Sequence, residues 1–354
     1  MAYTTINKSS DYFDTRTYSA SGAGSISDVS FQPDFLWFKN RTVVGDHGLM
    51  DSVRGINKIS HSNDTLAQIT SSATNDFTAF TSNGFTYGAS AQLDTSNGTP
   101  VTWLWKAGTT SGIATNGATT ITPQSYSFNQ TSGMSIINYD GNNTAGAKVA
   151  HGLGATPDMM IVKAMNSTAH WAVYHKSMGN THYMQFDTNQ QLDDAGVWND
   201  TSPDSVNFTV GISDKTNTVT YIAYCFAEKQ GFSKFGSYKG TGSSTGTPFI
   251  YTGFKPAFVM TKVISGGNDA WSMTDIPRDN AVGGGGNATG ARVTANETAA
   301  ESTNTSWASI QKYSNGFSPQ GTDSVTNAAG YTYIYMAFAK APLVGSNNVP
   351  ANAR

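Results

Sequence analysis

Charged residues and cysteine are both scarce in this chain of 354 residues. Only 13% of the residues are Asp, Glu, Lys or Arg, and the formal net charge is -3. Such a chain offers no basic surface for nucleic acid and no polybasic face for anionic lipid. The single cysteine, Cys225, excludes an internal disulfide framework and a cysteine-based zinc site. Within "YIAYCFAE" we expect it to be a small buried apolar residue.

Long apolar runs and strong helix formers are scarce as well. No run approaches membrane-spanning length, and the N-terminus lacks the basic and then apolar regions of a secretory signal. We therefore expect that the protein is assembled in a cytoplasm and does not insert into a membrane. Leu, Lys and Glu are few, whereas Gly, Ser, Thr and Asn dominate and aromatic residues reach 12%. Because turn formers and strand formers prevail, we expect an all-β protein.

What the sequence does contain is a stretch that occurs three times. "FQPDFLWFKNR", "ATPDMMIVKAM" and "GFKPAFVMTKV" each hold a proline, then alternating apolar residues, then a lysine. Period-two alternation predicts a strand. Because proline cannot donate a ladder hydrogen bond, it belongs at the first position of that strand. The corresponding residues are Pro33, Pro157 and Pro256, with Lys39, Lys163 and Lys262.

Each repeat ends in a second strand, rich in aromatic and small residues. These strands are "TWLWKAG", "YIAYCFAEK" and "YIYMAFAKA", in which Trp105, Phe226 and Phe338 stand 72, 69 and 82 residues after their prolines. Asn-Gly pairs at 83–84 and 315–316 predict hairpin turns. Self-similarity of this kind indicates one structural unit used several times.

The repeats predict three tandem antiparallel β-sandwich domains, jelly-roll or lectin-like, arranged in a row. We place an N-terminal arm plus the first sandwich at residues 1–110, a linker plus the second at 111–230, the third at 231–341 and a C-terminal tail at 342–354. The polar first 20 residues should form an arm outside the core. The tail should be ordered only by a neighbouring molecule.

A polar loop follows a short apolar strand in the middle of each repeat. The stretches "DHGLMDSVRG", "HWAVYHKSMG" and "AWSMTDIPRDN" lead to Arg54, Lys176 and Arg278. Such loops either contact a ligand or are solvated strand ends, and binding residues concentrate in loops. The sequence leaves both interpretations open.

Catalytic motifs are absent from the sequence. His170 and His175 are five residues apart, which places them on opposite faces of a strand, so they do not chelate one ion. Glycan hydrolysis needs two carboxylates on one cleft, but the neighbours Asp193 and Asp194 point to opposite sides of an extended segment. We therefore expect no enzyme, no catalytic residue, no cofactor and no metal.

Exposed aromatic residues would be the signature of sugar binding. Trp198 and Trp307 lie in polar loops and are the candidates, with burial in the core as the alternative. The third repeat also has the longest loop, from 279 to 305, which accounts for its 82-residue spacing. Within that loop, Gly284 and Arg292 are candidates for contact with a host molecule or a neighbouring subunit. A tolerated insertion is the alternative, because lengthening a loop costs little.

The repeat motifs resemble a family of virion proteins from marine, cyanophage-like bacteriophages. The resemblance rests on "AYCFAEKQGFSKFGSYKG", "GFKPAFVMTKV" and "YIYMAFAKAP", with "FQPDFLWFKNR" and "HGLGATPDMMIVK", and covers nearly the whole chain. The first repeat departs from it with "WLWKAG" in place of an Ala-Phe-Ala ending. The resemblance implies a non-enzymatic structural protein of the virion, a tail fibre or appendage component in host attachment.

The same resemblance implies partners. These are other tail or capsid proteins, further copies in a homo-oligomer, with a trimer the usual form of a fibre, and a host-surface glycan. A capsid decoration or capsid-fibre protein is the first alternative, and a glycan-binding or glycan-degrading surface module is the second. In each case we expect the chain in the virion, after assembly in a bacterial cytoplasm.

Overall fold

The computed structural model describes residues 3–70, 76–89, 98–193, 196–278, 288–289, 291–303 and 309–345. Within these ranges the chain forms antiparallel sheets and one 3-10 turn, η1 (Ser9–Asp11), but no α-helix. None of the described residues belongs to a helix with the length and apolar character needed to cross a membrane. The expectation of an all-β protein is confirmed, as the abundance of strand formers and turn formers predicts.

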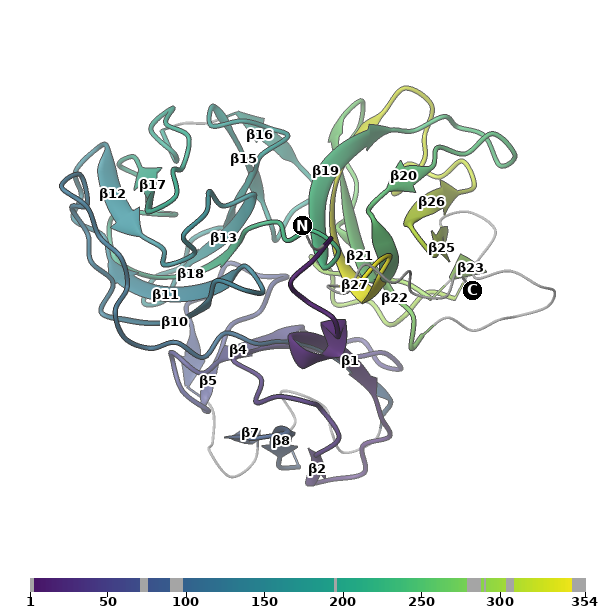
Figure 1. Cartoon of the computed structure of the whole chain (residues 1–354), viewed down its shortest axis with the longest axis horizontal. Helices are drawn as coiled ribbons and strands as arrows, with labels where there is room; N and C mark the ends of the chain where they lie inside the picture. Colours follow the sequence, from purple (N-terminus) through teal and green to yellow (C-terminus); the bar gives the residue numbers. More distant parts are fainter. Residues whose placement is uncertain are drawn as a thin grey trace.

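Three main sheets share one strand order, although each is built from a different segment of the chain (Figure 1). We name these segments unit 1 (residues 13–105), unit 2 (125–226) and unit 3 (233–342). The shared orders are β1-β9-β3-β4, β11-β18-β13-β14 and β19-β27-β21-β22. The bounds are β1 (Phe13–Thr17), β3 (Phe35–Asn40), β4 (Gly48–Asp51), β9 (Pro100–Trp105), β11 (Met134–Asp140), β13 (Met159–Ala164), β14 (Ala172–His175), β18 (Thr220–Phe226), β19 (Ser233–Lys239), β21 (Phe254–Ser265), β22 (Ser272–Asp275) and β27 (Thr332–Pro342).

A smaller sheet lies outside each main sheet. The orders are β2-β8-β7 in unit 1, β12-β17 in unit 2 and β20-β26-β25-β23 in unit 3. In addition, β5 pairs with β6, while β10, β15 and β16 widen the main sheet of unit 2 and β24 widens that of unit 3. The bounds are β2 (Gly24–Ile26), β5 (Lys58–Ile59), β6 (Ile69–Thr70), β7 (Phe77–Thr81), β8 (Gly84–Tyr87), β10 (Ser125–Asn129), β12 (Ala147–Ala150), β15 (His182–Gln185), β16 (Gln191–Asp193), β17 (Asn207–Val210), β20 (Ile250–Tyr251), β23 (Ala288–Thr289), β24 (Val293–Thr294), β25 (Ser309–Tyr313) and β26 (Gly316–Gln320).

The three proline-led strands pair with the three closing strands in the same register. Trp105 lies opposite Phe35, Phe226 opposite Met159, and Phe338 opposite Phe258. Each of these partners stands two residues after its proline, so the repeat seen in the sequence is a repeat of structure. The predicted correspondence of the prolines and of the closing aromatic residues is confirmed.

The position of the prolines differs from the prediction. Pro33 and Pro157 precede strands that begin two residues later, at Phe35 and Met159. Pro256 lies inside β21, where the pairing register shifts on both sides of it. The missing N–H of proline is tolerated in each case because the residue stands before the ladder or at an irregularity in it.

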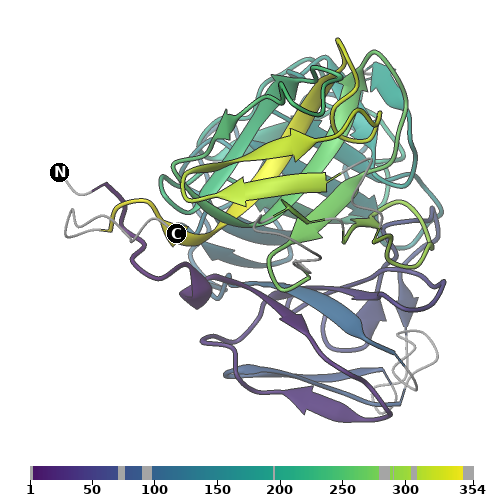
Figure 2. The same ribbon diagram turned by 90° about the vertical axis from the view of Figure 1, so that its right-hand side faces the viewer.

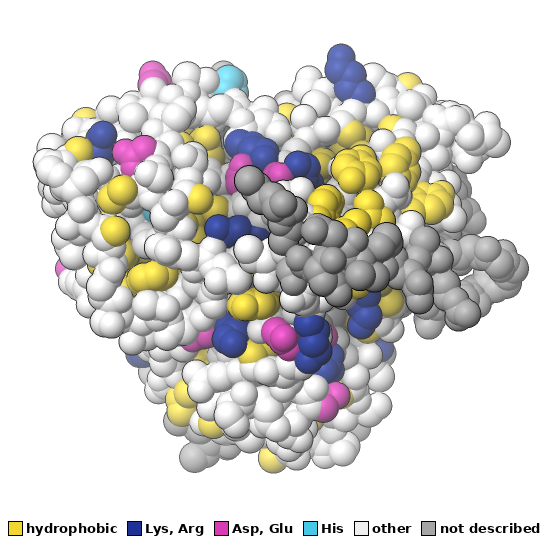
Figure 3. All heavy atoms as spheres, viewed as in Figure 1, with side chains coloured by type: hydrophobic (Ala, Val, Ile, Leu, Met, Phe, Trp, Pro, Cys, Tyr) yellow, Lys and Arg dark blue, Asp and Glu magenta, His cyan; other side chains and the backbone are white. Residues whose placement is uncertain are grey.

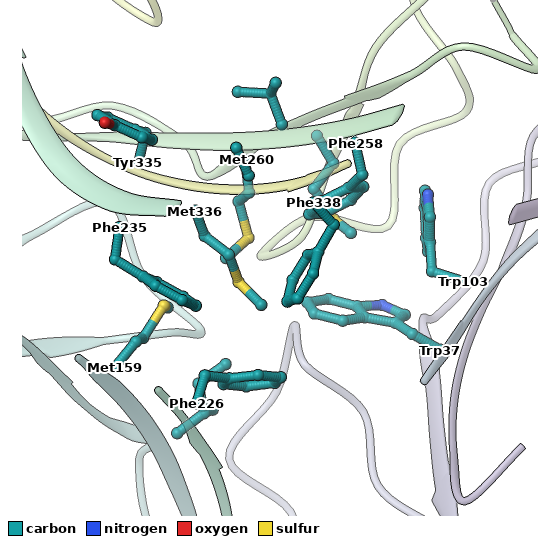
Figure 4. Close-up of a cluster of buried hydrophobic side chains, with 14 of the residues drawn as sticks. Trp37, Trp103, Met159, Phe226, Phe235, Phe258, Met260, Tyr335, Met336 and Phe338 are labelled. Atoms are coloured by element: carbon teal, nitrogen blue, oxygen red, sulfur yellow. The ribbon is translucent and has the colours of Figure 1, made fainter. Parts of the chain in front are cut away.

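The main sheets surround a common centre instead of standing in a row. The rings of Trp105, Phe226 and Phe338 meet there, with centroid separations of 5.7 to 6.3 Å between the three pairs. Figure 4 shows this cluster, in which side chains from all three lobes of Figure 1 point toward one another. The largest apolar core accordingly contains residues of all three units, which makes the centre a shared structure.

The central strands of the main sheets are buried on both faces. In unit 1, Phe35 and Trp37 face the common centre, while Leu36 and Phe38 belong to a second core beneath the outer sheet. Unit 2 repeats this division, with a separate outer core of its own. A strand covered on both faces has no solvent side, so every residue of β3, β9 and β13 is buried.

The N-terminal segment belongs to the core, so the prediction that it forms an arm outside the core is wrong. Ile6 and Phe13 are 1% and 2% exposed and belong to the common core, and Phe13 stacks on Phe338 at 5.0 Å. Phe13 also begins β1, which pairs with β9. Figure 2 shows the segment running beside the end of β27 before it enters unit 1, and Thr4 and Pro342 both lie against Gly231. Although most residues of this stretch are polar, its few apolar residues are buried and fix its position.

Both predicted Asn-Gly turns are present. Residues 82–83 join β7 to β8 and residues 314–315 join β25 to β26, so each Asn ends the connection and each Gly begins the following strand. Gly84 has a φ of +151°, and a side chain there would collide with the backbone oxygen of Ile26. Only glycine meets both conditions, because other residues rarely take positive φ and all carry a Cβ.

Candidate functional site

The lysines that end the three proline-led stretches are buried completely. Lys39, Lys163 and Lys262 are each 0% exposed, although lysine on a strand usually reaches solvent. An amine without water must find other acceptors, because an unpaired buried polar group is costly. In all three cases the acceptors are backbone carbonyl oxygens of two different units.

The three lysines connect the units in a closed ring. Each donates one hydrogen bond within its own unit and one to the neighbouring unit. Lys39 Nζ donates to the oxygens of Gly45 (2.5 Å) and Thr298 (2.9 Å), Lys163 Nζ to those of Ala169 (2.7 Å) and Thr65 (3.0 Å), and Lys262 Nζ to those of Asp269 and Asn189 (2.8 Å). Unit 1 is thereby joined to unit 3, unit 2 to unit 1, and unit 3 to unit 2.

Burial changes the protonation of these amines. It lowers the pKa of Lys39 and Lys163 to about 8 and that of Lys262 to about 7, against partial compensation from nearby carboxylates. A neutral amine still has two N–H groups, which is the number of carbonyl acceptors at each site. Each lysine therefore satisfies both acceptors whether it is charged or neutral.

A ring N–H makes a second connection beside each lysine. Trp171 Nε1 donates to the oxygen of His61 at 2.9 Å, and Trp271 Nε1 to that of Gln185 at 3.3 Å. In unit 1 the corresponding residue is His47, whose Nε2 lies 3.0 Å from the oxygen of Thr294. The side chains of Lys163 and Lys262 also lie over the rings of their tryptophans, at 6.0 and 5.9 Å from the centroids.

The tautomer of His47 follows from its two partners. Trp37 Nε1 donates to His47 Nδ1 at 2.9 Å, so Nδ1 carries no proton and Nε2–H donates to Thr294. Burial holds the pKa of His47 well below its ordinary value. His175 has the same arrangement, because Ser177 N donates to its Nδ1, and burial lowers its pKa to about 3. Both histidines are neutral structural groups.

The carbonyls that receive these bonds come from a short segment repeated in each unit. The segments are "HSNDT" at 61–65, "QFDTN" at 185–189 and "TANET" at 294–298, and their first and fifth carbonyls are the acceptors. The middle side chains, Asn63, Asp187 and Asn296, accept the backbone N–H of His47, Trp171 and Trp271 at 2.8 to 3.0 Å.

This repeated segment is hard to find from the sequence. Its only side-chain signal is an Asn or Asp 24, 24 and 34 residues after the lysine, which is faint because the acceptors themselves are backbone atoms. The 34-residue interval places the extra length of unit 3 before Asn296, in agreement with the longer loop predicted there.

The basic residues of the mid-repeat loops are structural in units 1 and 3. Arg54 pairs with Asp51 at 2.5 Å, and Arg278 pairs with Asp275 at 2.6 Å, with all four side chains at most 3% exposed. Tyr224 of unit 2 donates to Asp51, and Trp103 of unit 1 donates to Asp275. These ion pairs extend the connections between units and are buried, so both predicted interpretations, ligand contact and a solvated strand end, are wrong for the two arginines.

Lys176 is not the counterpart of these arginines. It follows the strand residue His175 directly, whereas Arg54 and Arg278 stand three residues after Asp51 and Asp275. It is exposed and pairs with Asp158 and Glu228, both at 2.9 Å. The position that corresponds to the arginines in unit 2 is Met178, which packs on the common core.

The remaining candidates from the sequence are dispersed. Trp198 is 1% exposed and packs edge-on to Tyr174 in the outer core of unit 2, so its ring offers no face to a ligand. Arg292 is half-buried, and its backbone N–H donates to Ser302. Trp307 and Gly284 lie outside the described residues, as do residues 346–354 of the predicted tail. The two described candidates, Trp198 and Arg292, lie in different units.

Cys225 and the possible metal ligands can be located in the described part of the chain. Cys225 is fully buried, as expected, and burial raises the pKa of its thiol. Among those residues, no group of three or more His, Cys, Asp or Glu side chains is arranged to hold a metal ion.

Exposed aromatic rings lie in a different place from the predicted tryptophans. Phe249 and Tyr251 are 51% and 54% exposed at the outer sheet of unit 3. In Figure 3 hydrophobic side chains gather on this lobe, in the part of the view where Figure 1 places β20 and β26. The signal in the sequence is "PFIYTG", where two aromatic residues flank an inward-facing Ile250.

Comparison with known proteins identifies one family. The family described as a domain of unknown function (DUF7483) matches residues 8–342. No curated protein matches the chain. No solved structure matches it either.

Proposed function

The chain belongs to the DUF7483 family, and from the resemblance of its repeat motifs we propose that it is a non-enzymatic structural protein of a bacteriophage virion, a tail fibre or appendage component that contacts the host surface. In this proposal the three units are three sandwich domains of jelly-roll or lectin-like type. One observation supports the structural part of this proposal: three buried lysines and three ring N–H donors join the units to one another through backbone acceptors.

The chemistry of those groups supports a mechanical role. Titratable side chains with strongly displaced pKa values commonly mark catalytic sites. Here the displaced lysines and histidines each donate to fixed backbone oxygens. Asp34, whose pKa burial raises, accepts hydrogen bonds from Ser52 Oγ and Ala107 N. Groups used in this way hold sheets in register and are not available for proton transfer to a substrate.

A capsid decoration protein is the second candidate, favoured by one specific feature. A fibre usually acquires its threefold axis from three copies of a chain. This chain joins three units around a centre within one copy, so it needs no further copies to complete that core. A single chain of this kind suits attachment to a shell as well as a place on an appendage.

Labelling of intact particles tests the proposal. Antibody raised against the purified chain should label particles from a phage that encodes it, and the purified chain should reduce adsorption of that phage to host cells. Label on the tail or its fibres supports the appendage, and label spread over the head supports decoration. Absence of the chain from purified particles, by mass spectrometry, would refute both.

A further inference from the structure

The outer sheet of unit 3 carries a strip of exposed aromatic rings. Phe249 and Tyr251 are two residues apart in an extended segment, so they lie on one face, while Ile250 between them is 6% exposed and points to the core. Tyr251 lies opposite Gly316 on β26, and Gly316 lies opposite Tyr313 on β25. The two tyrosines and Phe249 therefore share the solvent face of three neighbouring strands.

Glycine in the middle of this row lets the rings approach. A side chain at Gly316 would meet the ring of Phe249 at 2.8 Å. The Phe249 ring instead lies across the glycine and packs edge-on to Tyr313, with 5.7 Å between centroids. The result is a continuous aromatic surface in place of separate exposed rings.

The N-terminal segment fixes one end of the strip. Tyr3 OH donates to the oxygen of Gly253 at 2.9 Å and forms a side-chain hydrogen bond with Tyr251. A ring held in this way loses less side-chain freedom when it binds a ligand. The aromatic surface is thus preorganised by contacts within the chain.

Uncharged polar side chains border the rings. Ser318 Oγ donates to Thr247 Oγ1 at 2.8 Å, and Gln320 Nε2 donates to Ser318 Oγ at 3.0 Å. Gln311 lies opposite Ser318 on the same face and is half-buried, whereas Lys312 beside it is 0% exposed and faces inward. Ser318 and Ser309 are only 3% and 2% exposed, so the side chains of β25 and β26 that reach solvent on this face are the half-buried Gln311, Tyr313 and Gln320. All three are uncharged and can hydrogen bond, which suits a neutral partner rich in hydroxyl groups.

The fold itself does not require aromatic residues at these places. One apolar position is equivalent in the three outer sheets, because in each unit it pairs with a phenylalanine of the neighbouring strand. The pairs are Ile26 with Phe85, Val149 with Phe208, and Ile250 with Phe317. The flanking positions are Ser25 and Ser27 in unit 1, Lys148 and Ala150 in unit 2, and Phe249 and Tyr251 in unit 3. Units 1 and 2 form the same strand pairing without the rings, and exposed apolar patches on stable proteins mark interaction sites.

We propose that this strip, Phe249, Tyr251 and Tyr313 with the bordering Gln311, binds a neutral oligosaccharide. The ring faces stack against the C–H face of the sugars, and the amide and hydroxyl groups hydrogen bond with sugar hydroxyls. The inference rests on the proposed function, for which it names the class of host-surface ligand.

The test uses the full chain and a set of defined neutral probes. Titration calorimetry with cellohexaose, maltohexaose, mannohexaose and chitohexaose should reveal binding of at least one. In the double variant Phe249→Ser and Tyr251→Ser, which copies unit 1, the affinity should fall at least tenfold. The control Ile212→Ser removes a 57% exposed apolar side chain of unit 2 and should leave the affinity unchanged.

Three results would overturn the inference. The first is that none of the four hexasaccharides binds, and the second is that the double variant leaves the affinity unchanged. The third is a concentration-dependent dimer that the double variant abolishes, because it would show that the strip binds a second copy of the chain. A chain present in particles but inert toward sugars refutes this inference alone. A chain that binds sugar but is absent from particles refutes the proposed function instead.

Discussion

The junction that closes the ring, between units 3 and 1, differs from the two junctions between consecutive units. The consecutive junctions use Trp171 and Trp271, whose rings fill space as well as donate. The closing junction uses the smaller His47 and adds a carboxylate, Glu301, that pairs with Arg41 of unit 1 at 3.1 Å and with Arg278 of unit 3 at 3.0 Å. The backbone acceptor is the constant element, and the side chain that reaches it varies.

The difference has a physical reason in chain connectivity. Consecutive units are held close by the chain between them, although the junction of units 1 and 2 also contains a hydrogen bond from Tyr224 to the carboxylate of Asp51. Units 1 and 3 are separated along the chain by the whole of unit 2, so a contact between them closes a long loop. Charge-assisted hydrogen bonds are directional and stronger than neutral ones, so they favour a single closed arrangement. Substitutions can show how much each kind of junction contributes to stability.

The largest effect is expected at the buried ion pair beside the closing junction. Arg278→Met should lower the free energy of unfolding by about 3 to 5 kcal/mol, because it leaves the carboxylate of Asp275 buried without its cation. Urea unfolding followed by fluorescence measures the change. The double variant Asp275→His with Arg278→Met copies His175 and Met178 of unit 2 and should recover part of the loss. A double variant less stable than Arg278→Met would show that the unit 2 arrangement cannot be transferred.

A somewhat smaller effect is expected where a tryptophan is replaced by the group used at the closing junction. Trp271→His retains a ring N–H but removes apolar volume beside Phe186, whose ring centroid lies 4.7 Å from that of Trp271, and should cost about 3 kcal/mol. Trp271→Phe keeps more of the volume, leaves the oxygen of Gln185 without its donor, and should cost about 1 to 2 kcal/mol. Equilibrium unfolding of both variants decides which property matters. The reverse order would show that the hydrogen bond outweighs the packing.

The lysines common to all three junctions should make stability rise with pH. Burial lowers the pKa of Lys39 and Lys163 to about 8 and of Lys262 to about 7, whereas in the unfolded chain these groups keep the ordinary value of 10.5. Between about pH 7 and pH 10 the unfolded chain therefore binds more protons than the folded chain. The free energy of unfolding should rise by up to about 1.4 kcal/mol per pH unit for each lysine that is neutral.

Urea titrations at intervals from pH 7 to pH 9.5 measure that slope. Lys262→Met should reduce it, since one of the three groups no longer titrates. A flat or falling profile in the unaltered chain would mean that the three amines remain protonated when folded.

The smallest effect is expected at the outer sheets, where units 1 and 3 can be compared directly. Replacing Phe249 and Tyr251 with the serines of unit 1 should lower the free energy of unfolding by about 1 kcal/mol. Both rings are half exposed, but the change removes the contact with Tyr313 and the hydrogen bond with Tyr3. Thermal unfolding of the double variant checks this. A loss above 1.5 kcal/mol would show that the rings support the fold and would weaken the comparison between the two units.

Local patterns in the sequence predicted the strands and their correspondence. Alternating apolar residues after Pro33, Pro157 and Pro256 predicted the central strand of each main sheet, and the Asn-Gly pairs predicted two hairpins. The burial of Cys225 followed from its apolar neighbours. These features depend on residues close together in the chain, which is where sequence patterns are informative.

The same patterns were misleading where contacts are long-range. Trp198 stands in a polar loop and is nevertheless buried, and Phe13 stands in a polar segment and belongs to the common core. The exposed rings of Phe249 and Tyr251 were missed because a strand residue beside Ile250 reads as part of a core. The domain boundaries at residues 110, 230 and 341 stay predictions.

The sequence by itself determined the all-β class, the three repeated strand pairs and the place of each repeated lysine, because these depend on local spacing and on the chemistry of single residues. Only the tertiary structure decided that the units surround one centre and that the lysines are buried. The acceptor of Lys39 is the carbonyl oxygen of Thr298, 259 residues away in the chain. Every residue has such a carbonyl, so nothing in the side-chain pattern distinguishes the one that folding brings to the lysine.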